Sequence, residues 1–129
     1  MNQYILVVDD EEQIRELIAI YLRKQGFDVS SEESSAATLA SLRQRTPDLI
    51  VLDIGLADED GLRLLVDIKK EHPNVKVIML TGMGFVEDLL QEAVQKGEDG
   101  YVSKVLPLDE LLMAIQRACK PAQELQGAA

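Results

Sequence analysis

Cysteine is almost absent from this chain, since Cys119 is the only one among 129 residues. No disulfide can therefore form within the chain, which fits a reducing compartment such as the cytoplasm. No apolar run approaches the roughly 18 residues that a membrane-spanning helix needs. The first residues, MNQYILVV, also lack the basic region and long apolar stretch of a signal peptide. These absences predict a cytoplasmic domain with no membrane contact.

Positive charge is also scarce, with 13 Lys and Arg against 23 Asp and Glu, for a net charge of −10. Nucleic acid phosphates would repel such a domain, so we expect no direct binding of nucleic acid. Carboxylates instead suit a hard divalent cation. The length is that of one domain, and an apolar content of 47% is enough for one core.

Two kinds of segment alternate along the chain. Five short apolar segments, several rich in β-branched residues, predict buried parallel strands: Tyr4–Asp9, the stretch FDVSS around Val29, Leu49–Asp53, Val75–Leu80 and Gly100–Ser103. Apolar residues at helical spacing lie between and after them: Ile14–Leu22, Leu39–Leu42, Leu62–Ile68, Phe85–Val94 and Leu108–Ala118. Five such strand–helix units predict an α/β fold with one doubly wound parallel sheet.

Polar residues follow the predicted strands at the edge where an open parallel sheet binds ligands. Asp9 and Asp10 end the first strand and Asp53 ends the third. Thr81 ends the fourth, and Lys104 follows the fifth. With strand order 2-1-3-4-5, the acids would occupy the point where the winding direction switches.

Three carboxylates at one point require a cation, and their oxygens suit Mg²⁺. A carboxylate can also attack phosphorus to form an aspartyl phosphate. That transfer needs positive charge and hydrogen-bond donors around the phosphoryl oxygens, which a metal, a lysine and a hydroxyl could supply. We therefore predict a metal site in which Asp53 is the nucleophile.

Four sequence motifs resemble the receiver domain of two-component response regulators: VVDDE, LIVLDIGLADEDGL, VIMLTG and GYVSK. The resemblance covers roughly residues 4–119, which we extend to a receiver domain at 1–121 and a tail or linker at 122–129. It implies a flavodoxin-like (βα)5 fold that takes a phosphoryl group from a sensor histidine kinase or phosphotransfer protein. It also implies a signalling domain of a phosphorelay that catalyses only its own phosphorylation and dephosphorylation, rather than an enzyme with a separate substrate.

The resemblance further implies the roles of the site residues. Asp53 would be the phosphoacceptor and a metal ligand, and Mg²⁺ would also be bound by Asp9, Asp10 and the backbone carbonyl of Gly55. Thr81 and Lys104 would contact the phosphoryl group, and Thr81 with Tyr101 would be the switch residues. The fourth helix, fifth strand and fifth helix, around Phe85–Gly97 and Leu108–Cys119, would then form the surface for an effector or a second copy. The chain departs from the family pattern at Ala57 and Val105, where proline is usual. Gly55 and Met83 occupy positions that influence the lifetime of the phosphate in the family.

Three other interpretations compete with this one. Asp9 and Asp10 could be acids at a helix N-terminus, although that leaves Asp53 unexplained. A phosphohydrolase would need a second acid just after the nucleophile, where the sequence reads Asp53-Ile54-Gly55. A flavin or nucleotide carrier would need a phosphate-binding loop after the first strand, where the chain has acids instead. The kinase, the downstream target and any output domain stay open at this point.

Overall fold

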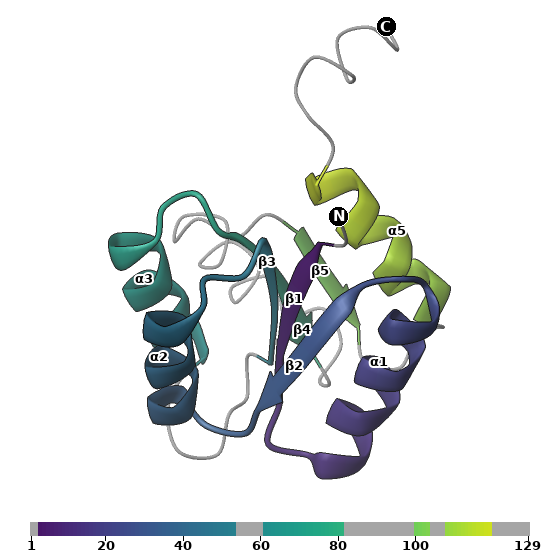
Figure 1. Ribbon diagram of the computed structural model, residues 1–129, viewed down its shortest axis with the longest axis horizontal. Helices are drawn as coiled ribbons and strands as arrows, with labels where there is room; N and C mark the ends of the chain where they lie inside the picture. The colour runs from purple at the N-terminus through teal and green to yellow at the C-terminus, as the bar shows by residue number, and fades with distance from the viewer. Residues whose placement is uncertain (1–2, 54–60, 82–99, 104–107, 120–129) are drawn as a thin grey trace, which may run out of the picture.

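The computed structural model describes residues 3–53, 61–81, 100–103 and 108–119. Five parallel strands form one sheet in the order β2-β1-β3-β4-β5 (Figure 1). Their bounds are β1 Tyr4–Val8, β2 Asp28–Glu32, β3 Leu49–Asp53, β4 Lys76–Thr81 and β5 Gly100–Ser103. The predicted strand order is confirmed, and the fold is the doubly wound α/β fold expected from the sequence. The predicted helix at Phe85–Val94 lies outside the described residues.

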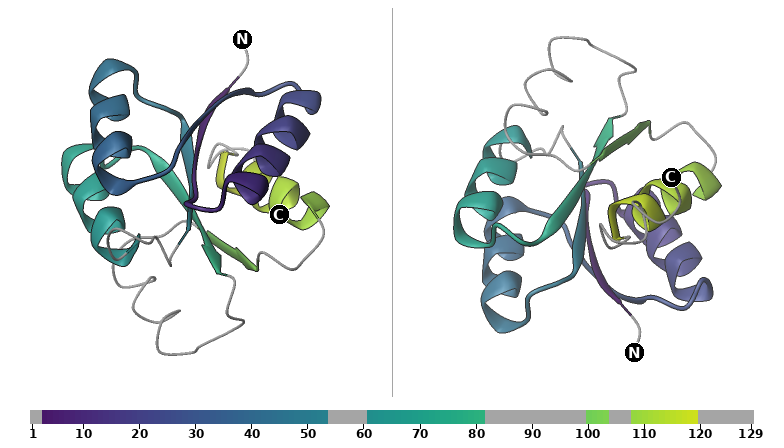
Figure 2. Two further views of the ribbon diagram at one scale, coloured as in Figure 1. Left: turned by 90° about the horizontal axis from the view of Figure 1, so that it is seen from below. Right: turned by 90° about the horizontal axis from the view of Figure 1, so that it is seen from above.

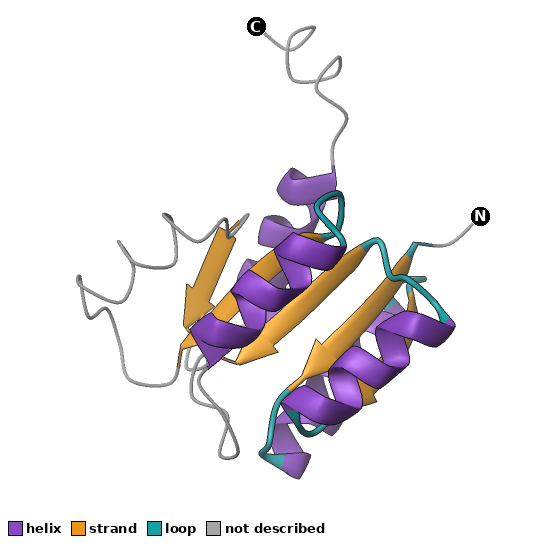
Figure 3. Cartoon of the chain, turned by 90° about the vertical axis from the view of Figure 1, so that its left-hand side faces the viewer, coloured by secondary structure: helices purple, strands orange, loops and turns teal. Residues whose placement is uncertain are grey.

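Helices cover both faces of the sheet. Helices α1 Glu12–Lys24 and α5 Leu108–Cys119 pack on one face, and α2 Ser35–Gln44 and α3 Gly61–Glu71 on the other (Figures 1 and 2). Figure 3 shows α2 and α3 lying side by side over one face of the sheet. Among the described helices, none is long and apolar enough to cross a lipid bilayer.

The alternation of side chains along the central strands divides the core into two halves. In β1, Ile5 and Val7 face the α1 and α5 side, while Leu6 and Val8 face the α2 and α3 side. The same period of two repeats in β3, where all five residues are buried. A strand buried on both faces reads as a continuous apolar run, which explains why these two strands were predicted from the sequence.

The C-terminal end of α1 explains where the chain turns toward β2. After α1, Gly26 takes a positive φ of 97°, a conformation that favours glycine. Its N–H donates to the Arg23 carbonyl at 3.1 Å, and the Phe27 N–H donates to the Leu22 carbonyl at 3.2 Å. These two bonds form a Schellman motif, in which Gly26 is the glycine that ends the helix.

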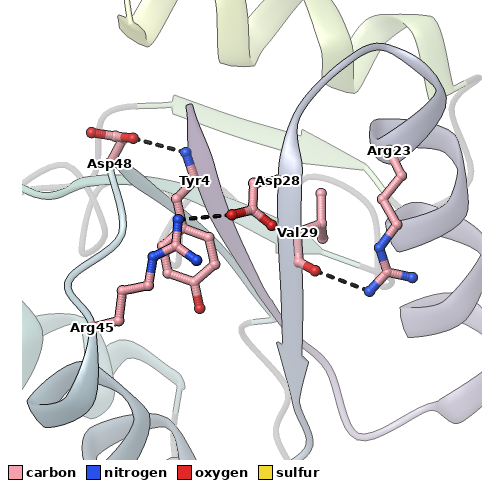
Figure 4. A network of polar contacts seen from close by, with 6 residues as sticks. All are labelled: Tyr4, Arg23, Asp28, Val29, Arg45 and Asp48. Atoms are coloured by element: carbon pink, nitrogen blue, oxygen red, sulfur yellow. Dashed lines mark hydrogen bonds and ion pairs between the residues drawn. The ribbon is translucent and has the colours of Figure 1, made fainter. Parts of the chain in front are cut away.

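A polar network lies at the amino ends of the strands, opposite the predicted site (Figure 4). The Asp48 carboxylate accepts a 2.8 Å hydrogen bond from the Tyr4 N–H. The Arg45 guanidinium forms a 2.7 Å ion pair with Asp28 and stacks 3.8 Å from the centroid of the Tyr4 ring. These contacts join the beginnings of β1, β2 and β3 to the residue that follows α2.

Candidate metal and phosphoryl site

Asp9 and Asp53 come together because β1 and β3 are neighbours in the sheet. Val8 of β1 pairs with Leu52 of β3, and the residue that follows each of them is an aspartate. Asp9 is 0% exposed and Asp53 is 3% exposed. Both acids therefore reach the carboxyl edge of the sheet at its centre, where the sequence predicted them.

Asp9 itself shapes the turn from β1 into α1. Its N–H donates to the Glu32 carbonyl at 3.2 Å, which continues the pairing with β2 by one residue. Its Oδ1 accepts a 2.8 Å hydrogen bond from the Glu11 N–H. Its own carbonyl accepts a 2.8 Å hydrogen bond from the Arg15 guanidinium. The predicted strand Tyr4–Asp9 therefore ends at Val8, because the Asp9 side chain turns the backbone away from the sheet direction.

The structure brings four carboxylates together rather than three. One oxygen from each of Asp9, Asp10, Glu11 and Asp53 lies within 4.8 Å of the others. Asp10 and Glu11 are exposed, whereas Asp9 and Asp53 are buried. Like charges at this distance repel each other, and a divalent cation would relieve the repulsion. The set of oxygen donors fits a hard ion such as Mg²⁺.

Sequence reasoning missed Glu11 as a member of this group. The signal available was its place as the third of four consecutive acids directly after the first strand. Asp9 and Asp10 do directly precede the N-cap residue of α1, which is Glu11. The alternative that they are only acids at a helix N-terminus still leaves Asp53 unexplained.

The other predicted residues are placed only in part. Thr81 is the last residue of β4, and its neighbour Leu80 pairs with Asp53. Tyr101 lies in β5 and pairs with Met79 of β4. The strands thus bring the Thr81 backbone next to the end of β3, at the edge that holds the acids. Gly55 and Lys104 lie outside the described residues.

Comparison with known proteins identifies a family. The family model described as the response regulator receiver domain matches residues 5–116. The nitrogen assimilation regulatory protein NtrX of Azorhizobium caulinodans is 38% identical over 120 residues, which is 92% of this chain and 26% of that protein. The DNA-binding transcriptional regulator NtrC of Escherichia coli K12 is 34% identical over 122 residues, or 95% of this chain and 26% of that protein.

Solved structures agree with the fold. The receiver domain of NtrX from Brucella abortus matches with a TM-score of 0.83 and 38% identity, covering 88% of this chain and 96% of that one. A CheY-like receiver domain protein from Methanospirillum hungatei matches with a TM-score of 0.84 and 29% identity, covering 91% and 93%. The chain spans about a quarter of the length of these two curated relatives, 26% of each.

Proposed function

This chain belongs to the receiver domain family of two-component response regulators, and we propose that its Asp53 accepts a phosphoryl group in a Mg²⁺-dependent reaction. The observation that carries the proposal is the position of Asp53, which is buried at the carboxyl edge with three other carboxylates within 4.8 Å. A phosphohydrolase has no comparable support, because no acid follows Asp53 in Asp53-Ile54-Gly55. A flavin carrier has none either, because acids stand after the first strand where it would need a phosphate-binding loop.

The transfer proceeds by attack of an Asp53 carboxylate oxygen on the phosphorus of a phosphohistidine. A new P–O bond forms as the P–N bond breaks, and the departing imidazole nitrogen keeps the electron pair. Mg²⁺, when bound, would supply positive charge that offsets the charge of the phosphoryl oxygens. Because the side chain of Asp53 is already fixed in the sheet edge, little conformational entropy is lost as it reaches the reactive position.

The neighbouring residues hold the ion and the phosphoryl group. Asp10 and Asp9 would hold the cation together with the Gly55 carbonyl. The Asp9 carboxylate is oriented by the hydrogen bond that its Oδ1 accepts from the Glu11 N–H at 2.8 Å. Thr81 and Lys104 donate hydrogen bonds to the phosphoryl oxygens and offset their charge. These assignments follow the family pattern, residue by residue, at positions where this sequence has the expected residue type.

The output of the domain is a change in protein contacts. The surface around residues 85–97 and Leu108–Cys119 has two conformations. The balance between them is shifted by Thr81, which is drawn toward the phosphoryl group, and by Tyr101 on the adjacent strand. That surface binds an effector or a second copy. A sensor histidine kinase or phosphotransfer protein supplies the phosphoryl group to this domain in the cytoplasm. The domain signals without turning over a separate substrate.

The first test is the intact mass of the protein after incubation with acetyl phosphate and Mg²⁺. We expect the gain of one phosphoryl group, which chelation of the metal prevents. The substitution Asp53→Asn should abolish the gain. The matched control is Asp48→Asn, which neutralises an exposed acid just before the other end of the same strand and should leave the gain intact. Full labelling of Asp53→Asn would reject the proposal.

A further inference from the structure

We infer that Glu11 is an additional binding residue for the divalent cation, acting through a water of the ion, and the inference rests on the proposed function of this site. Its carboxylate lies within 4.8 Å of those of Asp9, Asp10 and Asp53. The next acid along the chain, Glu12, does not belong to this group in the part of the chain that the structure describes. Two adjacent acids thus differ in their relation to the site.

The backbone explains why Glu11 and not Glu12 faces the site. The Glu11 N–H donates to Asp9 Oδ1 at 2.8 Å, and the Glu11 carbonyl accepts from the Arg15 N–H at 2.9 Å as the first bond of α1. Glu11 itself has extended dihedral angles, with φ −87° and ψ 106°, and its side chain caps no backbone group. The direction of the Glu11 side chain is therefore set by a turn that the Asp9 carboxylate stabilises, whereas Glu12 is already the first residue of α1.

The chemistry of the ion explains why Glu11 would act through water. Mg²⁺ keeps several of its waters and takes only one or two carboxylates directly. The buried Asp9 and Asp53 and the exposed Asp10 already provide enough direct ligands. Glu11 is exposed, so its carboxylate can accept a hydrogen bond from a metal-bound water while its charge attracts the ion. Such an effect raises affinity and weakens as salt screens the charge.

Calorimetric titration of the protein with Mg²⁺ alone tests the inference. We expect Glu11→Gln to weaken binding on the order of three- to tenfold at low salt. Glu12→Gln, which removes the same charge one residue away, should weaken binding clearly less. Glu11→Asp, which keeps the charge, should restore most of the affinity. The difference between Glu11→Gln and the wild type should shrink as the salt concentration rises.

Two failures can be told apart. In the first, Glu11→Gln and Glu12→Gln bind Mg²⁺ equally well, while the wild type binds Mg²⁺ and is phosphorylated at Asp53. This result would overturn the role of Glu11 and leave the proposed function standing. A wild type that neither binds Mg²⁺ nor gains a phosphoryl group would overturn the proposed function itself. Circular dichroism of each variant shows whether a loss of affinity reflects a loss of fold, and a folded Glu11→Gln with weakened binding supports the inference.

Discussion

The carboxylates of Asp9 and Asp53 lie within 4.8 Å of each other although both side chains are almost completely buried. Without a cation, this pair should destabilise the fold through charge repulsion. We expect Asp9→Asn to raise the free energy of unfolding by about 1 kcal/mol in the absence of divalent ions, since an amide oxygen can still accept from the Glu11 N–H. Urea denaturation with and without Mg²⁺ measures the effect.

The same variant should lose most of the stabilisation that Mg²⁺ gives the wild type, because a ligand stabilises only the state that binds it. Glu12→Gln serves as the control for a general change in net charge, and it should respond to Mg²⁺ like the wild type. An Asp9→Asn protein that is less stable than the wild type without Mg²⁺ would show that repulsion is not the dominant interaction at this position.

Arg45 should stabilise the opposite end of the sheet by its contacts with Tyr4 and Asp28. An exposed cation–π contact and an exposed ion pair each contribute up to about 1 kcal/mol. With its side chain 57% exposed, Arg45→Ala should lower the free energy of unfolding by about 1 kcal/mol. Urea denaturation curves with unchanged slope would measure this loss directly.

Arg63→Ala provides the control for that loss. Arg63 forms a 3.8 Å ion pair with Asp67 along α3, and its side chain is 70% exposed. Such a pair contributes less than about 0.5 kcal/mol. Equal losses for the two variants would mean that the stacking of Arg45 on Tyr4 adds nothing.

Cys119 should react slowly with alkylating reagents. Burial, followed by the nearby Asp48 carboxylate, raises the pKa of the thiol above its ordinary value of 9.0, while a hydrogen bond from Gln3 and the charge of Lys76 oppose that rise. Asp48→Asn should lower the pKa and increase the rate of reaction with iodoacetamide at mildly alkaline pH. Asp67→Asn, on the other face of the sheet, should leave the rate unchanged.

The raised pKa also predicts how stability depends on pH. The folded state holds the thiol proton more tightly than the unfolded chain does. The contribution of the thiol to the stability of the fold is therefore complete below pH 9 and is lost as the pH rises through the higher pKa of the folded state. Cys119→Ser should remove that part of the alkaline loss. An unchanged pH profile for the serine variant would contradict the assignment.

Most of the sheet and three of the four acids could be predicted because they depend on local patterns. Apolar runs in β1 and β3 reveal strands buried on both faces, and parallel strands present their last residues at one edge. The end of β1 at Val8 could not be predicted, because Asp9 continues the run as a plausible last strand residue. Only its hydrogen bond to the Glu11 N–H shows where the chain turns.

The contacts that sequence reasoning missed all depend on the folded backbone. The sequence does not distinguish Glu11 from the acids beside it, since the direction of its side chain depends on the dihedral angles of the turn. Arg45 stacks on Tyr4 from 41 residues away in the numbering of the chain (45 − 4). No period or motif in the sequence relates these two residues, because the pairing of the strands brings them together.

The proposed switch predicts a distant response to the site. Binding of beryllium fluoride, which mimics the phosphoryl group, should shift amide resonances near Asp53 and also along Leu108–Cys119. Thr81→Ala should keep the first set of shifts and reduce the second, because the hydroxyl that follows the phosphoryl group is gone. Ser103→Ala, at the residue paired with Thr81, is the matched control and should retain both sets. Shifts confined to the site in the wild type would refute the switch.

The most direct test of the account is chemical identification of the phosphorylated residue. The wild-type protein is incubated with acetyl phosphate and Mg²⁺ and then reduced with borohydride, which converts an aspartyl phosphate to homoserine. Peptide mapping by mass spectrometry then locates the change. We predict homoserine at position 53 and unmodified aspartate at positions 9 and 10. Homoserine at another position, or none at all in a protein that binds Mg²⁺, would contradict the assignment of Asp53 as the phosphoacceptor.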